Sequence, residues 1–379
     1  MFRLLTQDPA SPTPRFGSMT LKGIRRKIVA VGDLHGDMIN ARHVLRFSGV
    51  VDKNLDWSGN VDILVQTGDI IDRGDDTIEL FDMMDKLRAQ AAAKGGQVLS
   101  ILGNHEWMNA IGDWRYVYPT EIETFGGVKE RQRMISTGRI GRTWAANYTT
   151  ALRLPLHPSF GPPNTPYPPS KSTVDNQSEW NEADGKNPFS HSALSFIHGG
   201  LSPTYSNIAP FPSRINELSS SLMYKLQSRE QPPPHPPHPY PGLPDDATDE
   251  EHELYSSNGP LWYRGWALHP EEQVCAEIDK VLRKTGTRRM IMGHTPDFHN
   301  IVSRCNGTIL IIDTGISHAY GGVLSALSID YSFAPVIKDG AAKWVETETV
   351  SALYADSFDV VAHDVREVED DSFSDWVFI

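Results

Sequence analysis

Cysteine is nearly absent from this chain, which has only Cys275 and Cys305 in 379 residues. Two cysteines cannot form the several disulfides that hold small secreted domains together, so we expect no disulfide framework and take a reducing compartment as the default. Cys275 falls within a helical pattern of apolar residues, which favours a small buried thiol.

Long apolar runs are absent as well. No stretch of about 18 apolar residues occurs, so the sequence predicts no membrane span. Residues 1–27 have no apolar signal core, which argues against secretion. We therefore expect a cytoplasmic protein, and the basic residues of that segment keep a mitochondrial location, through a short transit segment, as the alternative.

Basic charge is in deficit, since 35 lysines and arginines face 48 acidic residues and the formal net charge is −13. Nucleic acids and anionic membranes attract basic proteins, so we expect neither as the main partner. The acidity favours solubility and says little about the substrate.

What the chain does contain is a set of five apolar runs, each ending in a glycine-flanked aspartate, asparagine or histidine. A buried strand followed by glycine sets such a side chain at the carboxyl edge of a sheet, where α/β proteins bind ligands. Any one motif could be a polar turn or an ordinary core histidine, but five together favour a shared site. The motifs are Gly32-Asp33-Leu34-His35-Gly36, Gly68-Asp69-Ile70-Ile71-Asp72-Arg73-Gly74, Gly103-Asn104-His105-Glu106, His198-Gly199-Gly200 and Gly293-His294.

Strand and helix patterns alternate in the first third of the chain, which predicts parallel strands with helical crossovers. Consecutive short strands after residue 308 predict an antiparallel sheet layered on the first. The expected fold is therefore α/β, with two mixed β-sheets flanked by helices. We expect one catalytic domain over residues 24–350, because the motif strands are spread from residue 27 to residue 294.

Several segments lie outside this regular pattern. Residues 1–23 are expected to be a flexible lead-in and residues 351–379 an acidic, solvated tail. The aromatic and charged segment 107–144 fits equally a helical subdomain packed on the sheet or a lid over the site. Segments 157–190 and 229–253 are predicted insertions, and the second contains a proline-rich run, 231–244, expected to be extended and mobile. A role in binding a partner is the weaker interpretation of that loop and of the acidic tail.

The strand-end residues suit a pair of metal ions. Asp69 is the natural bridging carboxylate, because two neighbouring cations need a shared ligand. Mixed oxygen and nitrogen ligands suit Mn, Fe or Zn better than Mg or Ca, and the identity of the ions stays open. The other ligands that we assign are Asp33 and His35 for the first ion, and Asn104, His198 and His294 for the second.

A bridging water between two cations loses a proton near neutral pH and can attack phosphorus in line. His105, next to a metal ligand, is placed to protonate the leaving oxygen, and Asp72 is the candidate carboxylate that orients its imidazole. Arg73 can hold the phosphate oxygens as a fork. Arg264 is our candidate for a second guanidinium, with a surface salt bridge as the alternative.

In this order, the five motifs resemble the calcineurin-like metallophosphoesterases of the phosphoprotein phosphatase class, over roughly residues 27–330. The stretches 64–76 and 103–109 resemble the Shewanella-like branch of that class. The resemblance implies the calcineurin-like metallophosphoesterase fold, two metal ions and the residue roles given above. It also implies a tyrosine near the phosphate, for which Tyr320 is the nearest match, although a packed core tyrosine fits that position equally.

The function expected from these observations is dinuclear-metal-dependent hydrolysis of phosphomonoesters on phosphoproteins, at phosphotyrosine, phosphoserine or phosphothreonine. A nucleotide polyphosphate or phosphodiester hydrolase is the alternative within enzymes. The alternative of another class is an inactive phosphoprotein-binding scaffold. That alternative predicts a degraded ligand set, whereas every ligand position here is filled.

Overall fold

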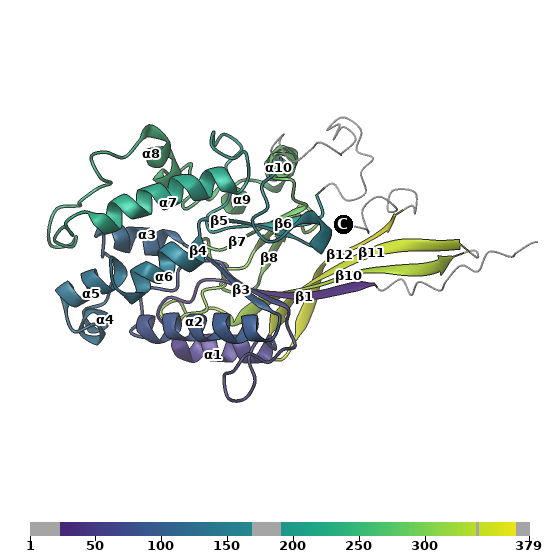
Figure 1. Ribbon diagram of the computed structural model, residues 1–379, viewed down its shortest axis with the longest axis horizontal. Coiled ribbons are helices and arrows are strands. Elements are labelled where there is room, and N and C mark those ends of the chain that lie inside the picture. The colour runs from purple at the N-terminus through teal and green to yellow at the C-terminus, as the bar shows by residue number, and fades with distance from the viewer. Residues whose placement is uncertain (1–22, 169–190, 339–340, 369–379) are drawn as a thin grey trace, which may run out of the picture.

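The computed structural model describes residues 23–168, 191–338 and 341–368, and its elements form two β-sheets with helices outside them (Figure 1). The larger sheet has seven strands, in the spatial order β12 (Phe358–Val368), β11 (Ala341–Tyr354), β10 (Ser325–Lys338), β1 (Ile24–Val31), β2 (Ile63–Gln66), β3 (Gln97–Ile101) and β4 (Tyr148–Thr149). The smaller sheet has five, in the order β5 (Ala151–Pro155), β6 (Ala193–Ile197), β7 (Arg289–Met292), β9 (Ile309–Ile311) and β8 (Val302–Arg304).

Alternating burial along the strands explains how the layers pack. On β1, Ile28 and Ala30 join an apolar cluster that includes Phe196 of the smaller sheet, so this cluster lies between the two sheets. Val29 and Val31 belong to the second cluster, which includes the helices. Successive residues of a strand point to opposite faces, so a continuous apolar run is buried on both sides.

Helices cover both outer faces of the two sheets. Helices α1 and α2 lie along one side in Figure 1, and α7 to α10 lie along the other. The helices are α1 (Met38–Phe47), α2 (Thr77–Ala93), α3 (Asn104–Ile111), α4 (Pro119–Thr124), α5 (Val128–Ile135), α6 (Arg139–Asn147), α7 (Ser213–Ser228), α8 (Asp249–Tyr255), α9 (Gly265–Leu268) and α10 (Glu271–Thr285), with a 3-10 turn η1 (Pro158–Phe160). In the described ranges, no helix combines the length and apolar composition needed to span a bilayer.

The first helices follow the sequence pattern closely. Helix α1 begins after Asp37, whose carboxylate accepts a hydrogen bond from the backbone N–H of Asn40 at 2.9 Å, as expected for an N-cap. It buries Val44 and Leu45, whereas Ile39 is 66% exposed. Helix α2 buries Leu80, Met84, Leu87 and Ala91, which recur at helical spacing.

Parallel pairing brings the strand-end motifs to one edge of each sheet. Strands β1, β2 and β3 run parallel in the larger sheet, and β6, β7 and β9 run parallel in the smaller one. Parallel neighbours end on the same side, so the residues that follow them converge.

The C-terminal strands differ from the prediction. Strands β10, β11 and β12 pair antiparallel onto β1 and extend the larger sheet, whereas a separate antiparallel sheet was expected. Residues 351–354 and 358–368 lie in β11 and β12, so this part of the expected tail forms paired strands, while residues 369–379 lie outside the described part, as do 1–22 and 169–190. The acidic composition does not exclude a strand here, because β12 pairs along β11 and its Asp364 pairs with Arg289 of the smaller sheet.

The cysteine prediction is wrong. Cys275 of α10 and Cys305, just after β8, form a disulfide with a Cα–Cα distance of 5.4 Å, and Cys275 is exposed. Cys275 follows the buried Val274 in the helix and lies off its buried face, a difference of one position that the helical pattern did not resolve. The cysteine argument for a reducing compartment therefore loses its support.

The proline-rich run 231–244 is docked on the molecule, contrary to the expectation of an extended and mobile loop. The backbone N–H of Trp114 donates to the carbonyl of His235 at 2.6 Å, and the backbone N–H of His235 donates to the carbonyl of Gly112 at 2.9 Å. Gln132 donates to the carbonyl of Pro232 at 2.7 Å. Prolines remove donors but leave their carbonyls available, and neighbouring segments supply the N–H groups.

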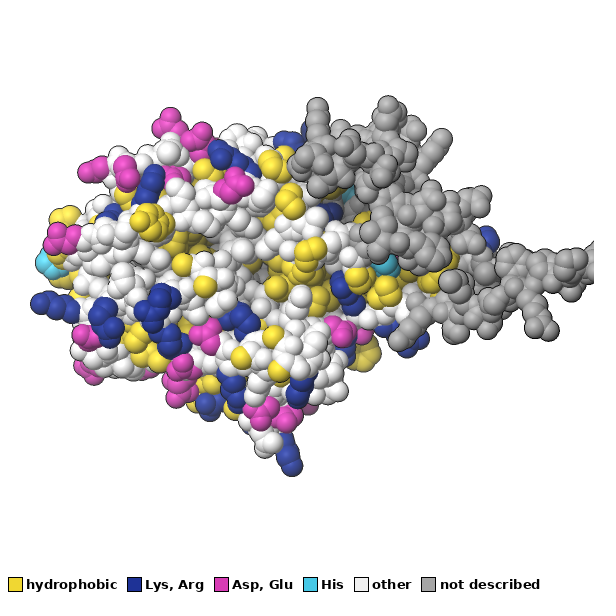
Figure 2. Space-filling view, viewed as in Figure 1, with side chains coloured by type: hydrophobic (Ala, Val, Ile, Leu, Met, Phe, Trp, Pro, Cys, Tyr) yellow, Lys and Arg dark blue, Asp and Glu magenta, His cyan; other side chains and the backbone are white. Residues whose placement is uncertain are grey.

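Charge is distributed unevenly over the surface. On the face seen in Figure 2, basic side chains gather over α5 and α6, where Lys129 and Arg133 are exposed, and acidic ones gather over α8, which begins with Asp249 and Glu250. The net charge of −13 therefore does not describe any single site, and recognition has to be argued from local groups.

Candidate active site

The six predicted metal ligands meet where the two sheets end side by side. Asp69 lies at the centre: its Oδ2 is 3.7 Å from Nε2 of His35 and 3.2 Å from Nε2 of His198. Two sets of side chains could each hold a metal ion, with ligand atoms within 4.8 Å of one another, and Asp69 belongs to both. The sets are His35, Asp69 and His105, and Asp69, His198 and His294.

The other two predicted ligands border these sets. Asn104 Oδ1 lies 2.9 Å from Nε2 of His198. The Asp33 carboxylate accepts the backbone N–H of His294 at 3.2 Å, which ties the first strand of one sheet to the β7 end of the other. His105 Nε2 also lies 3.9 Å from Asp69 Oδ2, so the residue predicted as the acid is in the first potential metal set as well.

The backbone that carries these ligands is strained. His35, Asp69 and His294 have positive φ angles of 43°, 54° and 69°, a region that non-glycine residues adopt at a cost of about 1–3 kcal/mol each. Glycine is required beside them, because a Cβ on Gly103 would collide with the Asp69 carboxylate and one on Gly293 with that of Asp33. Such strain is concentrated at functional sites, where the surrounding structure enforces it.

Glu106 holds the backbone around Asp69, and sequence reasoning had given it no role. Its buried carboxylate accepts the backbone N–H groups of Asp69 at 2.9 Å, Ile70 at 2.8 Å and Gly103 at 2.8 Å. Burial, together with the nearby Asp69, raises the pKa of Glu106 to about 7. Its position as the last residue of the Gly-Asn-His-Glu motif was a signal that could have indicated its role.

The chemical properties of the predicted ligands are those expected of a site that binds cations. Burial, with the nearby Asp313 and Asp69, raises the pKa of Asp33 well above its usual range, as expected where acidic groups crowd together without a counter-charge. His294 is buried, and its Nε2 has no hydrogen-bond partner among the residues that the structure describes. Carboxylates and imidazoles arranged in this way are the donors that Mn, Fe and Zn accept.

His105 and Asp72 form the predicted pair. Nδ1 of His105 is 2.7 Å from Oδ2 of Asp72, and both side chains are buried. Burial favours the neutral imidazole, but Asp69 and the hydrogen bond to Asp72 outweigh it and raise the pKa of His105. The imidazole is thereby held in one orientation, with Nε2 directed toward the ligand cluster.

A buried arginine missed by sequence reasoning supports this pair. Arg131 of α5 is fully buried, and its guanidinium reaches Asp72 at 3.4 Å, Glu121 at 3.0 Å and the side-chain oxygen of Asn109 at 2.5 Å. Its guanidinium also lies over the Trp114 ring, 4.5 Å from the centroid. The segment 107–144 thus contributes a buried side chain that contacts the site, and its two interpretations, a subdomain packed on the sheet or a lid, both stay predictions. Arg131 could not be distinguished by sequence from the other arginines of this segment.

The two predicted arginines contact different members of the cluster of predicted ligands. The Arg73 guanidinium lies between the rings of Tyr116 and Tyr320, at 4.5 and 4.7 Å, and its Nη2 is 3.5 Å from Nε2 of His105. Arg264 Nη1 donates to the carbonyl of His294 at 2.7 Å and to the hydroxyl of Thr295 at 2.9 Å. Neither acceptor is a carboxylate, so these contacts are not the surface salt bridge considered as the alternative.

Tyr320 lies at the site and not in the core. Its ring contacts those of His35 and Phe298, and the side chain is half-buried. Burial raises the pKa of Tyr320, so its hydroxyl keeps its proton. Two more residues here were not predicted: Tyr116, and Asp313, whose pKa burial raises to about 6. Asp313 follows the apolar residues of β9 and precedes Thr314-Gly315, the same signal as in the five motifs.

The chain is a calcineurin-like phosphoesterase. The model of that family matches residues 26–298, which is more than half of the chain, so the chain belongs to the family. The expectation of an enzyme that hydrolyses phosphoric monoesters is confirmed, as is the expected fold.

Among individual proteins, the chain is 36% identical over 307 residues to an uncharacterized protein of Schizosaccharomyces pombe, covering 80% of this chain and 76% of that one. It is 28% identical over 295 residues to Shewanella-like protein phosphatase 1 of Plasmodium berghei, covering 77% of this chain and 67% of that one. The crystal structure of a cold-active protein-tyrosine phosphatase of Shewanella shares the fold, with a TM-score of 0.60, 20% identity, and coverage of 89% of this chain and 80% of that one. The predicted resemblance to the Shewanella-like branch is therefore confirmed.

Proposed function

We propose that the chain is a two-metal phosphoprotein phosphatase that hydrolyses phosphomonoesters on protein side chains, at phosphotyrosine, phosphoserine or phosphothreonine. The observation that supports this most directly is that two overlapping ligand sets share Asp69 while the His105–Asp72 pair faces the same carboxylate. The names of the Plasmodium and Shewanella proteins, a protein phosphatase and a protein-tyrosine phosphatase, point to the same substrate class.

In this proposal Asp69 is a ligand of both ions. Asp33 and His35 complete the first site, and Asn104, His198 and His294 complete the second. When bound, the two cations supply positive charge for the phosphate oxygens and lower the pKa of a water to give the attacking nucleophile. Mn, Fe and Zn fit the mixed donor set equally.

The arginines position the phosphoryl group. Arg73 is held between two tyrosine rings and lies 3.5 Å from His105, so a phosphate bound to its fork brings its ester oxygen close to that imidazole. Arg264 approaches from the β7 side, fixed by its bond to the His294 carbonyl. Tyr320, whose ring contacts Arg73, adds a hydroxyl donor for the phosphate. Together these groups form a clamp that orients the substrate for in-line displacement.

His105 acts as the general acid. Its Nε2 proton passes to the leaving oxygen, while Asp72 stabilises the charged imidazole through Nδ1. Arg131 and Asn109 hold Asp72 in turn, from α5 and α3. The proton is most needed when the leaving group is an alkoxide, as in phosphoserine, and least when it is a phenoxide.

Metal analysis with a substrate panel tests the proposal. The protein is expected to bind two ions per chain when supplied with Mn, Fe or Zn, and to hydrolyse phosphopeptides faster than dinucleoside polyphosphates. A preference for the dinucleotides would identify a nucleotide hydrolase, and two bound ions without turnover of any phosphoester would identify a binding scaffold. The cytoplasmic location and its mitochondrial alternative stay predictions.

A further inference from the structure

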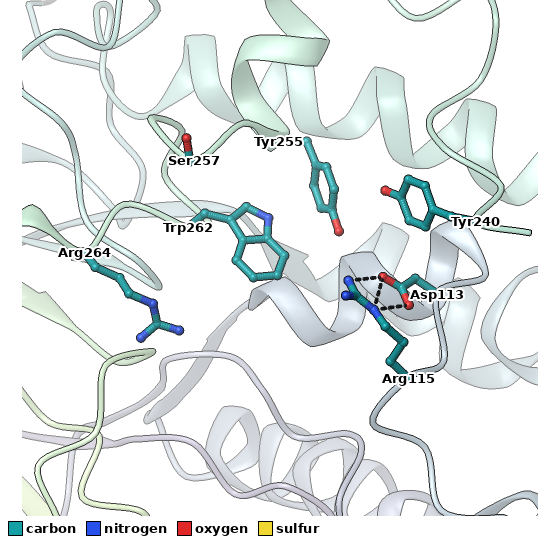
Figure 3. A pocket seen from close by; sticks show the side chains of 7 residues that line it. All are labelled: Asp113, Arg115, Tyr240, Tyr255, Ser257, Trp262 and Arg264. Atoms are coloured by element: carbon teal, nitrogen blue, oxygen red, sulfur yellow. Dashed lines mark hydrogen bonds and ion pairs between the residues drawn. The ribbon is translucent and has the colours of Figure 1, made fainter. Parts of the chain in front are cut away.

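An open groove of about 530 Å³ adjoins the proposed active site, and the proposed reaction does not use most of it. Figure 3 shows its side chains converging from three segments: the end of α3, the proline-rich run, and the stretch from α8 to Arg264. The residues that matter here are Asp113, Arg115, Tyr240, Tyr255, Trp262 and Arg264.

The groove is continuous with the proposed metal site. The Trp262 ring lies edge-on to that of the ligand His294, with centroids 5.7 Å apart, and the Tyr255 ring lies 5.8 Å from that of Trp262. Arg264 lines the groove and also donates to the His294 carbonyl at 2.7 Å. A peptide whose phosphate lies at the metal ligands can therefore extend along this aromatic wall.

The far side of the groove is fixed by the docked proline-rich run. The bonds between His235 and the chain at Gly112 and Trp114 hold this run against the end of α3. Arg229 donates to the carbonyl of Gly242 at 3.2 Å and to that of Ile111 at 2.6 Å, so it links the run to the end of α3. Tyr240 is thus presented by an anchored segment, and the groove is formed before any ligand binds.

The polar groups of the groove are mainly hydrogen-bond donors. Its single carboxylate, Asp113, is buried and is already bound by Arg115, with Nε at 2.9 Å and Nη2 at 2.7 Å. The Arg115 side chain is nevertheless 51% exposed, and Arg264 adds a second positive charge. Burial, with Tyr240 and Asp113 nearby, raises the pKa of Tyr255, so its hydroxyl also remains a donor.

We propose that this groove binds an aspartate or glutamate side chain of the substrate, close in sequence to the phosphorylated residue. Two guanidinium groups and one carboxylate leave the groove with a net charge of +1, so a carboxylate ligand complements the charge, and the aromatic wall packs against its methylene groups. A nucleobase fits less well, because Tyr255 and Trp262 meet at 87° and offer no parallel slot for a flat ring. This inference rests on the proposed phosphoprotein phosphatase function.

The test uses pairs of phosphopeptides that differ only by glutamate or glutamine at one position, from three residues before to three after the phosphorylated residue. The measured quantity is the ratio of kcat/KM for the glutamate peptide to that for the glutamine peptide. For the wild-type protein we expect a ratio of about five at one or two positions, the effect of a partly exposed charge pair. The ratio should fall toward one at high salt, because ions screen such pairs.

Two substitutions should move this ratio in opposite directions. Arg115→Gln leaves the Asp113 charge uncompensated, so the ratio should fall to one or below. Asp113→Asn frees the Arg115 charge, so the ratio should rise by about another twofold to fivefold. Arg115→Lys keeps the charge and should keep the preference. Because each ratio compares two peptides on the same protein, partial loss of folding in a variant does not mimic the result.

Separate outcomes distinguish this inference from the proposed function. If the wild-type protein hydrolyses the phosphopeptides with a ratio near one at every position, the groove assignment is wrong and the phosphatase proposal stands. If ratios change in the same direction in Arg115→Gln and Asp113→Asn, charge recognition is likewise excluded. If only p-nitrophenyl phosphate or dinucleoside polyphosphates are hydrolysed, both proposals fail.

Discussion

The metal-ligand edge and the aromatic groove lie side by side but are built in different ways. The predicted ligands follow buried strands and are themselves almost fully buried; three of them adopt strained backbone angles, and Glu106 holds the backbone of Asp69. The groove is built from loops, is lined by partly exposed side chains, and is held by a few hydrogen bonds. The comparison indicates that the predicted ligands are tied to the core, whereas the substrate recognition that we propose for the groove lies on loop segments.

Asp69→Asn should have the largest effect, because only this carboxylate belongs to both potential metal sets. We expect lower occupancy of both ions and a fall in kcat of more than about 100-fold, since even changes beyond the ligands themselves cost 10- to 100-fold. Metal content and turnover are measured together. Asp82→Asn, an exposed substitution on α2, is the matched control. Two bound ions with normal turnover would disprove the bridging role.

His105→Asn should slow phosphoserine peptides about 10²-fold more than phosphotyrosine peptides, because a phenol is a better leaving group and needs less help from an acid. Single-turnover rates on matched peptides measure this, so that product release does not obscure the chemical step. Arg73→Ala is the comparison: it holds the phosphate common to both substrates, so both rates should fall by similar factors. The reverse pattern would exchange the two assigned roles.

Arg131→Gln tests whether helix α5 stabilises the buried edge through Asp72. Losing one member of a buried ionic network leaves Asp72 and Glu121 uncompensated, and we expect a loss of about 3–5 kcal/mol in the free energy of unfolding. Urea unfolding measures this. Arg133→Gln, exposed on the same helix, should change stability by less than about 0.5 kcal/mol.

The same variant has a catalytic readout. If Arg131 positions the His105–Asp72 pair, Arg131→Gln should slow phosphoserine more than phosphotyrosine, as His105→Asn does but to a smaller extent. A purely structural role would reduce both rates equally.

Replacing residues 231–244 by a short Gly-Ser linker should have the smallest effect on the metal site. Lys225 of α7 donates to the carbonyl of Asp246 at 2.7 Å, which holds the chain just after the run against α7. We expect unchanged metal content and a stability loss of about 2 kcal/mol, from a few backbone hydrogen bonds worth about 1 kcal/mol each. Loss of bound metal would show that the groove side and the buried edge are coupled.

Sequence patterns predicted the buried edge well for a physical reason. A continuous apolar run that ends in glycine and a polar residue describes both the strand and the place where its ligand emerges, so Asp33, Asp69 and Asn104 could be assigned from their neighbours alone. The same signal was present at Asp313 and was overlooked. Resemblance to known motifs supplied the expected role of Tyr320, which residue spacing alone could not indicate.

Other features depend on contacts between distant segments, which local patterns do not contain. Glu346 and Glu348 appear as acidic residues in sequence, but they are core residues because Arg288 and Arg289 face them across the sheets. The disulfide joins residues 30 positions apart, and its exposed position contradicts the local helical pattern. Composition correctly identified the proline-rich run as irregular, but irregular structure can still be anchored by the donors of neighbouring segments.

The sequence by itself determined the strand-ending motifs, the class of fold and the donor atoms available for metal ions, because each depends on residues within about ten positions of one another. The tertiary structure decided that Arg131 holds Asp72, that β10 to β12 extend the larger sheet, and that the proline-rich run closes a groove beside the site. These three features depend on which surfaces come into contact. Local sequence patterns are compatible with several such arrangements, and burial and charge pairing across the whole molecule select one of them.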